Sequence, residues 1–283
     1  MADPEVAARL SAALVAQAGG YLRNTVRQEL VTCAVCATPV TGFRLCYQCQ
    51  RRRGRTGLAD ATGFLTYAVA GRQSAYVMQG YKARPPVPEH RTIVSLLVLL
   101  GLAWHAGCAE RAGSAERAGS AGRPGSAEHA GSAGVPVTHW ATVPSLPARA
   151  GEHPLHGIVS RLAPGREVAL AAADEVEYPR DLDPGHFRPS APLPAGAHVL
   201  LVDDTWARGG HAQSAVLALR AAGAARVSVL VAARWINEDF GGNAAFLRGL
   251  ADRDYDPAIC PWTGIDCPPP EVADDLDDST QPG

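Results

Sequence analysis

The chain has no large excess of charge of either sign. Its 283 residues include 26 Lys or Arg and 28 Asp or Glu, which gives a formal net charge of −2. This balance argues against bulk electrostatic binding of nucleic acid. Lysine is almost absent, since Lys82 is the only lysine among the basic residues. A compact ammonium at one position of an arginine-rich chain marks Lys82 as a candidate functional residue, with a surface lysine as the alternative.

The chain also lacks long apolar runs. The longest, from Ile93 to Trp104, is shorter than the ~20 apolar residues of a spanning helix, so it predicts a buried helix and no membrane partner. The first residues, MADPEVAARL, lack a basic start followed by an apolar signal core, which predicts a cytoplasmic protein. A hydrophobic content of 47% is enough for one main core.

Four of the seven cysteines form two tight pairs, Cys33-Ala-Val-Cys36 and Cys46-Tyr-Gln-Cys49. Two Cys-x-x-Cys turns supply the four thiolates of a tetrahedral structural zinc, and a closed Cys₄ site stabilises a module without catalysing. The alternative is four reduced cysteines or a redox pair. The basic run from Arg51 to Arg55 follows directly and is a candidate DNA contact, although a solvated charge run is favoured in this arginine-rich chain.

The stretch from His198 to Leu219 reads as a buried strand, an acidic pair, a glycine loop and a helix. The strand ends in Asp203 and Asp204, and Gly209 and Gly210 precede the helix. The start of a helix attracts an anion, and the two carboxylates can accept hydrogen bonds from hydroxyl groups. The pattern therefore favours a ligand that carries both a phosphate and a diol.

This order resembles the phosphoribosyl pyrophosphate (PRPP) loop of type I phosphoribosyltransferases. The resemblance implies that Asp203 and Asp204 hold the ribose hydroxyls and that the backbone from Ala207 to His211 wraps the 5′-phosphate. Arg208 and His211 stand where the family pattern has threonines. Either they act as cationic substitutes or the loop has lost catalytic competence.

Three further motifs in the same chain order resemble the ComF family of phosphoribosyltransferase-like proteins, associated with competence: the cysteine pairs, Tyr81-Lys82, and a Val-Pro loop. This last motif is Val143, Pro144 and Ser145, followed by Arg149. The resemblance implies that this loop contacts pyrophosphate, chiefly through Arg149 and more weakly through His153, with Lys82 as a further cation. A plain loop between a strand and a helix is the alternative.

Several other segments yield predictions of structure. Short helices are expected within residues 5 to 30, a β-hairpin from 61 to 82, strands at 138–143, 167–173 and 226–233, and helices from Pro154 and over 212–222. Four Gly/Ser hexads make residues 109–134 a disordered insertion. Cys108 is interpreted as a core residue, and Cys260 with Cys267 as core residues or a local clip, because their spacing is poor for zinc. The region 178–194 is a candidate hood over the acceptor.

These predictions together describe an α/β protein with a type I phosphoribosyltransferase-like central parallel sheet flanked by helices and an N-terminal Cys₄ zinc-ribbon-like module. The expected divisions are a helical segment at 1–30, the zinc module at 31–55, the phosphoribosyltransferase-like domain at 61–250, and a tail at 251–283. The resemblance implies binding of PRPP or a nucleotide and Mg²⁺-assisted transfer of the phosphoribosyl group to a nitrogen acceptor, as in nucleotide metabolism. The alternative is a non-catalytic protein whose zinc module engages DNA or a protein partner. Neither the acceptor nor the oligomeric state follows from the sequence.

Overall fold

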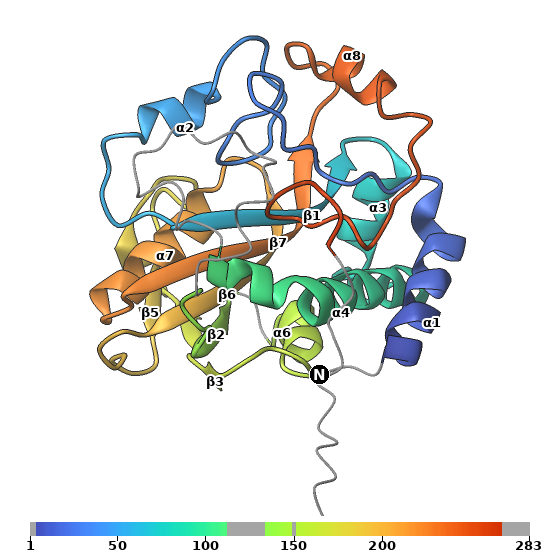
Figure 1. Cartoon of the computed structure of the whole chain (residues 1–283). Helices are drawn as coiled ribbons and strands as arrows, with labels where there is room; N and C mark the ends of the chain where they lie inside the picture. The colour runs from blue at the N-terminus through green and yellow to red at the C-terminus, as the bar shows by residue number, and fades with distance from the viewer. Residues whose placement is uncertain (1–3, 112–133, 149–150, 268–283) are drawn as a thin grey trace, which may run out of the picture.

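A computed structural model describes residues 4–111, 134–148 and 151–267 of the chain (Figure 1). Most of the hexad insertion, Arg149 and the acidic C-terminal stretch lie outside the described residues. The predictions made for them therefore stay predictions.

A five-stranded parallel sheet forms the centre of the molecule (Figure 1). Buried apolar runs such as those at 199–202 and 227–233 form its middle strands, as is usual for a parallel sheet covered on both faces. The α/β class with a central parallel sheet flanked by helices is therefore confirmed. In spatial order the strands are β1 (Ala61–Val69), β7 (Arg226–Ile236), β6 (His198–Trp206), β2 (His139–Thr142) and β3 (Arg166–Glu167).

Helices cover both faces of this sheet. Because side chains alternate along a strand, Leu200 and Val202 of β6 face one layer while Val199 and Leu201 face the other. The first layer contains helices α1 (Pro4–Leu14), α3 (Gln73–Gly80), α4 (Pro88–Arg111) and α6 (Pro154–Val159). The second contains helix α7 (Gly210–Ala221) and the cysteine-rich module with its short helix α2 (Tyr47–Arg51).

Helix α7 joins β6 to the neighbouring parallel strand β7, which confirms the predicted strand–helix–strand unit. The other elements are small. They are a π-helical turn η1 (Val15–Gly19), a two-stranded antiparallel sheet of β4 (Leu170–Ala172) and β5 (Phe187–Pro189), a 3₁₀ turn η3 (Pro184–His186), and helix α8 (Asn243–Arg248).

Helix α4 is the predicted buried helix, but it is longer than its most apolar run. By length and composition it could cross a membrane, yet 56% of its most apolar 18-residue window is buried inside the protein. Its buried side chains include Val94, Leu97 and Val98, which pack in the core of the first layer. This burial is typical of the central helix of a soluble domain.

The predicted hairpin over 61–82 is wrong. Its first arm is strand β1, but its second arm is helix α3, whose buried side chains include Val77 and Met78. The Ser74 hydroxyl, at the start of α3, accepts a hydrogen bond from the backbone N–H of Val69 at 3.0 Å. The short apolar and aromatic pattern of residues 73–82 fits a strand or a helix equally well. The packing of this segment against α4 favours the helix.

Three other boundaries differ from the predictions. The strand expected at 167–173 is two short strands in different sheets, β3 and β4. The helical part of the N-terminal segment ends at Gly19, and residues 22–28 have no regular secondary structure. Residues 251–267 of the predicted tail pack with the domain, since Tyr255, Cys260 and Trp262 are buried in the core of the first layer, and for Cys260 this is one of the predicted alternatives.

Candidate functional site

The acidic pair lies on strand β6, close to its C-terminal end. Asp203 is paired with Val231 of β7, whereas the pairing of β6 with β2 stops at Val202. The strand itself runs on to Trp206, three residues beyond Asp203 and further than the sequence predicts. By strand alternation the two carboxylates point to opposite faces of the sheet, with Asp204 on the face of α3 and α6.

Three side chains from two separate segments converge on the Oδ2 atom of Asp204. The Tyr81 hydroxyl donates a hydrogen bond to it at 2.7 Å, and the Lys82 ammonium lies 2.5 Å away. The Nε2 atom of His153, the residue before α6, lies 3.5 Å from the same oxygen. The fold therefore brings Lys82 and Asp204, predicted separately, together with Tyr81 of the same Tyr-Lys motif and with His153 of the predicted pyrophosphate loop.

The two carboxyl groups differ strongly in their electrostatics. Burial, followed by the nearby charge of Asp204, raises the pKa of Asp203 to about 8. Burial also opposes ionisation of Asp204, but the charges of Lys82 and His153 and the hydrogen bonds from Lys82 and Tyr81 hold its pKa below its usual value. Near neutral pH the site therefore holds one ionised carboxylate beside a largely protonated one.

A cleft of about 380 Å³ opens beside this cluster. Lys82 and His153 form part of its wall, and Pro144 and Ser145 of the predicted Val-Pro loop form another part. Val143 does not line the cleft, because its side chain is buried in the second core layer. The remaining lining residues come from the segments 83–91, 148–154 and 170–172.

The predicted phosphate loop, Ala207 to His211, is tightly packed. Gly209 has a φ of +71°, and a Cβ there would lie 2.2 Å from the Trp206 ring. A Cβ at Gly210 would lie 2.5 Å from the carbonyl oxygen of Arg180. Close packing therefore leaves no room for a side chain at either glycine. The segment around Arg180 covers the start of α7. Burial lowers the pKa of His211 below its usual value.

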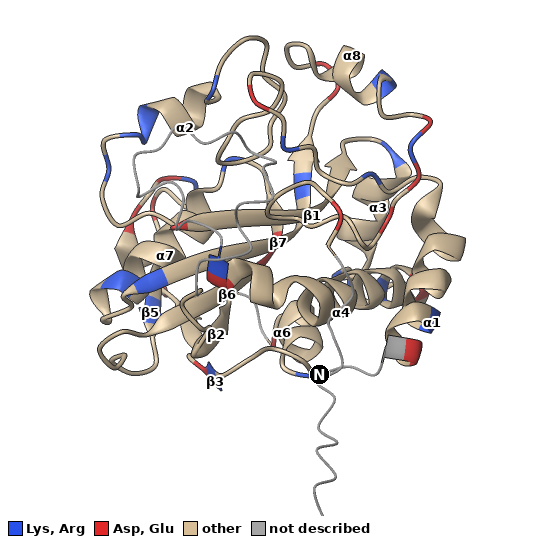
Figure 2. Ribbon diagram, in the orientation of Figure 1, with Lys and Arg blue, Asp and Glu red and all other residues tan. Residues whose placement is uncertain are grey.

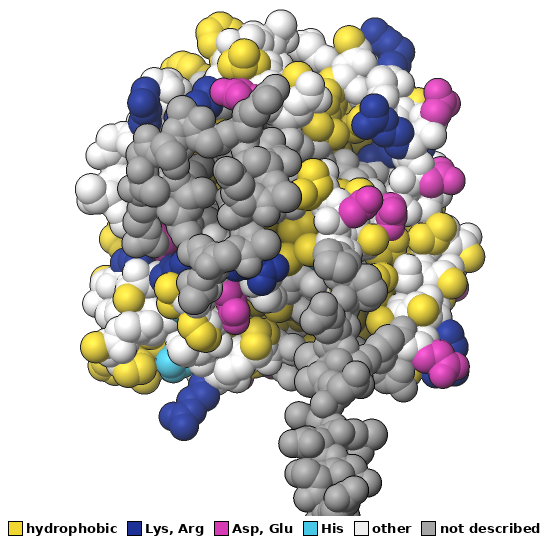
Figure 3. Space-filling model, viewed as in Figure 1, with side chains coloured by type: hydrophobic (Ala, Val, Ile, Leu, Met, Phe, Trp, Pro, Cys, Tyr) yellow, Lys and Arg dark blue, Asp and Glu magenta, His cyan; other side chains and the backbone are white. Residues whose placement is uncertain are grey.

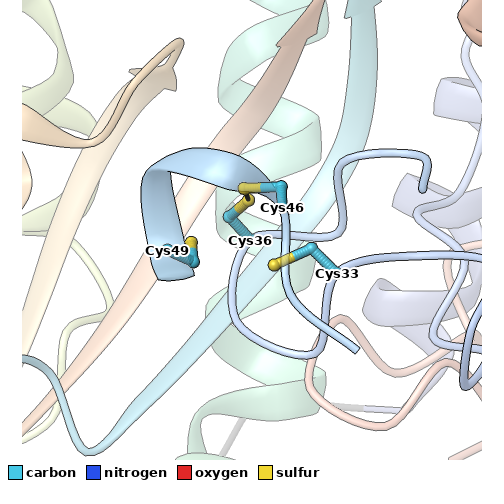
Figure 4. A group of neighbouring side chains, drawn as sticks. All are labelled: Cys33, Cys36, Cys46 and Cys49. Carbon is cyan, nitrogen blue, oxygen red and sulfur yellow. Dashed lines mark hydrogen bonds between the residues drawn. The ribbon is translucent and has the colours of Figure 1, made fainter. Parts of the chain in front are cut away.

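The four predicted zinc ligands come together on the other side of β6. Cys33 and Cys36 lie on a loop, and Cys46 and Cys49 lie at the start of α2, with their sulfur atoms pointing toward a common centre (Figure 4). The four sulfur atoms lie within 4.8 Å of one another, and the sulfurs of Cys36 and Cys46 are 3.6 Å apart. Four thiolates around one tetrahedral ion are ~3.8 Å apart, so this group could hold a zinc ion.

A buried arginine connects this cysteine module to the end of β6. Arg234 on β7 donates from Nε to the carbonyl of Cys36 at 2.8 Å, and from Nη1 to the carbonyl of Trp206 at 2.8 Å. Nη1 also lies 3.1 Å from the carbonyl oxygen of Ala207. Arg52 adds an exposed hydrogen bond to the carbonyl of Arg208 at 2.8 Å. The cysteine module thus supports the predicted phosphate loop, Ala207 to His211.

A second metal-binding group was missed in the sequence analysis. Cys108 is buried in the core of the first layer, as predicted, but its thiol is not isolated: it lies with Cys260, Cys267 and His105, and the four ligand atoms are within 4.8 Å of one another, so the group could hold a metal ion. The one available signal was the i, i+3 spacing of His105 and Cys108, which places both on one face of a helix. Their distance in sequence from Cys260 concealed the rest of the group.

The surface carries charges of both signs. Basic residues occur on and beside α2, while acidic and basic positions are mixed elsewhere along the ribbon (Figure 2). On the face shown in Figure 3, the described Lys, Arg, Asp and Glu side chains are interspersed and form no continuous patch of one sign. The mixture of charges on the described part of this face agrees with the near-neutral composition.

Comparison with known proteins adds no relative from which a function could be transferred. No protein-family model matches the chain, and no curated protein matches its sequence. The candidate function therefore depends on the motifs and on the geometry around Asp204.

Proposed function

We propose that the protein is a phosphoribosyltransferase-like protein that binds PRPP or a nucleotide beside Asp204. The observation that carries the proposal is the convergence of Tyr81, Lys82 and His153 on one carboxylate next to a cleft. In open α/β sheets, ligands bind outside the carboxyl ends of the strands, which is where this group lies. The motif resemblance supplies the substrate class.

The polarity of the cleft suits a charged sugar phosphate. Asp204 is the acceptor for a ribose hydroxyl, and a hydroxyl bound there competes with Lys82 for the Oδ2 atom. The released ammonium then lies at the mouth of a cleft where pyrophosphate would bind. Ser145, which also lines the cleft, supplies a hydroxyl donor. Asp203 points to the opposite face of the sheet, where its Oδ1 accepts a hydrogen bond from the backbone N–H of Asp204 at 2.8 Å, so in this structure it does not line the cleft.

Catalysis by such a site would consist mainly of positioning. A nitrogen nucleophile forms a bond to C1 of the ribose while the bond from C1 to the pyrophosphate oxygen breaks, and pyrophosphate leaves with that electron pair. Lys82 lowers the energy of the departing anion, and Mg²⁺ bound with PRPP would neutralise further charge. Arg149, the predicted pyrophosphate contact, lies outside the described residues.

Calorimetric titration of Mg²⁺–PRPP into the purified protein tests the proposal. The native protein should bind PRPP, and an Asp204→Asn variant should bind it at least tenfold more weakly. Asp174→Asn is the matched control, because Asp174 carries an exposed carboxylate paired with Arg188 on the surface. Equal affinity in all three proteins, or no binding by any of them, would refute the proposal. Release of pyrophosphate in the presence of nucleobases or amines tests transfer separately.

One observation favours the alternative, a non-catalytic binding protein. The carbonyl of Arg180 packs against Gly210, so the start of α7 is covered where the motif would bind a phosphate. Under this alternative the cysteine module binds DNA or a protein. Binding of DNA by the module is tested with an Arg51→Ala/Arg53→Ala variant. This variant leaves Arg52 in place, because Arg52 contacts Arg208. Salt-sensitive DNA binding that is lost in this variant would support the alternative, and its absence from the native protein would contradict binding of DNA by the module.

A further inference from the structure

We propose that His105, Cys108, Cys260 and Cys267 bind a second structural zinc ion that fastens the C-terminal segment to helix α4. The four residues offer three thiols and one imidazole, which is the donor set of a closed Cys₃His zinc site. A disulfide would use only two of the three thiols, whereas one tetrahedral ion uses all four groups. His105, Cys108 and Cys260 are buried, so the centre is closed to solvent on most sides.

The imidazole of His105 is arranged as a metal ligand. Its Nε2 atom lies 2.9 Å from the carbonyl oxygen of Pro257, so Nε2 carries the proton and donates it there. The Nδ1 atom then has a free lone pair, and it is buried without a hydrogen-bond partner among the described residues. A hydrogen bond from the remote ring nitrogen to a backbone carbonyl is the usual way in which a protein orients a zinc-bound histidine. One ion at the centre of the group would satisfy this buried acceptor and the three neighbouring sulfur atoms together.

The turn at Cys260 repeats the backbone of the turn at Cys33. In each turn, an isolated β-bridge joins the residue before the cysteine to the residue six positions after the cysteine. These bridges are Thr32 to Pro39 and Ile259 to Asp266. Each cysteine N–H donates to the carbonyl five residues on at 2.8 Å, and each cysteine carbonyl accepts from the N–H four residues on. That fourth residue has a positive φ in both turns, 52° at Ala37 and 75° at Gly264.

This shared turn points to the same role, because in both places it holds a cysteine whose sulfur lies within 4.8 Å of the other ligand atoms of its group. The two turns differ only in where the next ligand lies. The first uses Cys36, three residues after Cys33, whereas the second has Thr263 at that position and uses Cys267. Spacing alone therefore conceals a similarity that the backbone reveals.

The zinc would join segments far apart in the sequence. The C-terminal segment lies along edge strand β1, where Phe64 N–H donates to the carbonyl of Pro261 at 3.3 Å. The ring of Trp262 covers Gly63 so closely that a Cβ there would lie 2.8 Å from it, and its indole N–H donates to the carbonyl of His105 at 3.1 Å. Fastening this segment adds to the protection of the β1 edge, which residues 23–27 also cover through hydrogen bonds such as that from Thr25 Oγ1 to the carbonyl of Phe64 at 2.6 Å.

Metal content measured by mass spectrometry of the protein purified without chelators tests the proposal. The native chain should contain two zinc ions. A Cys260→Ser/Cys267→Ser variant should contain one, as should the matched Cys33→Ser/Cys36→Ser variant, and the combined variant none. One zinc in the native chain and still one in Cys260→Ser/Cys267→Ser would overturn the proposal. So would an intact mass showing a disulfide among Cys108, Cys260 and Cys267.

Substitution of His105 keeps the test informative if the serine variants fail to fold. His105→Cys should retain two zinc ions. The two ions together have eight ligands, and X-ray absorption should show that the number of sulfur ligands rises from seven in the native chain to eight in this variant. His105→Ala should retain one ion in a folded chain. A histidine needed only for packing would give the same zinc content in both variants, and that result would refute its role as a ligand.

Discussion

The Nε atom of Arg234 donates a hydrogen bond to the carbonyl oxygen of Cys36 at 2.8 Å. The same guanidinium contacts the carbonyls of Trp206 and Ala207, so one buried side chain connects the first cysteine group to the loop after β6. These acceptors are backbone groups that would lose their partner if the arginine were removed. The cysteine module is therefore part of the structure that supports the candidate site.

We expect Arg234→Ala to lower the free energy of unfolding by ~3 kcal/mol, because it leaves buried carbonyls without a donor and creates a cavity. Arg234→Lys should recover only part of this loss, since one ammonium cannot span the same set of acceptors. Urea unfolding with zinc present measures the effect. Arg188→Ala, which removes an exposed ion pair with Asp174, is the control and should change stability by less than ~1 kcal/mol. Equal losses in Arg234→Ala and the control would contradict the coupling.

Loss of the first metal site should loosen the loop after β6. In a Cys33→Ser/Cys36→Ser variant we expect amide hydrogen exchange at residues 206–211 to accelerate by at least tenfold, because the Arg234 bridge loses its anchor at Cys36. Helix α4 belongs to the other layer and should keep its protection. Unchanged exchange at 206–211 would show that the loop is stable without the zinc module.

The raised pKa of Asp203 predicts a specific pH dependence. Its folded value is about 8 against an ordinary 3.8, so between these values the folded chain holds a proton that the unfolded chain has lost. The contribution of Asp203 to stability therefore falls as pH rises through this window. We expect Asp203→Asn to be more stable than the native chain at pH 8, by ~1 kcal/mol or more, and nearly equal to it at pH 4.

Urea unfolding at several pH values checks this expectation. The matched control is Asp174→Asn, whose side chain is 88% exposed and whose effect should stay small at every pH. A constant difference between Asp203→Asn and the native chain from pH 4 to 8 would mean that Asp203 titrates normally.

Asp204 should show the opposite dependence. Its pKa is lowered in the folded chain, so its contribution is present above the ordinary value of 3.8 and disappears as pH falls through the folded value. Lys82→Met removes the charged partner from a carboxylate with a 10% exposed side chain and should cost ~2 kcal/mol at pH 7. The cost should shrink below pH 4. A double-mutant cycle with Asp204→Asn isolates the pair, and a coupling energy near zero would contradict the interaction.

The sequence predicts the elements whose pattern is local. The apolar strands around β6 and β7 and the helix between them are recognisable because each is long enough to show its own burial pattern. The first cysteine group is equally clear, since all four ligands lie within one short segment. Tyr81 to Lys82 is different. Its place at the end of a helix depends on packing that no local pattern records.

The second metal group and the Asp204 cluster could not be predicted as units. Cys108 and Cys260 are brought together by the packing of α4 against residues 251–267, and the spacing of His105 and Cys108 alone does not point to Cys260 and Cys267. Lys82 and Asp204 could each be singled out, yet their contact depends on α3 ending over β6. Burial of an arginine such as Arg234 is similarly hidden in a chain where arginine is the common cation.

The glycines of the predicted phosphate loop provide a test of packing that is independent of any ligand. Gly210→Ala places a methyl group 2.5 Å from the Arg180 carbonyl, and Gly209→Ala adds a strained positive φ to a contact with the Trp206 ring. We expect each to lower the free energy of unfolding by ~2 kcal/mol. Gly20→Ala meets no atom within 4 Å and has an ordinary negative φ, so it should be neutral or slightly stabilising. Thermal unfolding of the three variants without any ligand decides the matter. If Gly209→Ala and Gly210→Ala leave the apo protein as stable as Gly20→Ala does, the glycines are free of packing constraints and the phosphate interpretation of the loop gains weight.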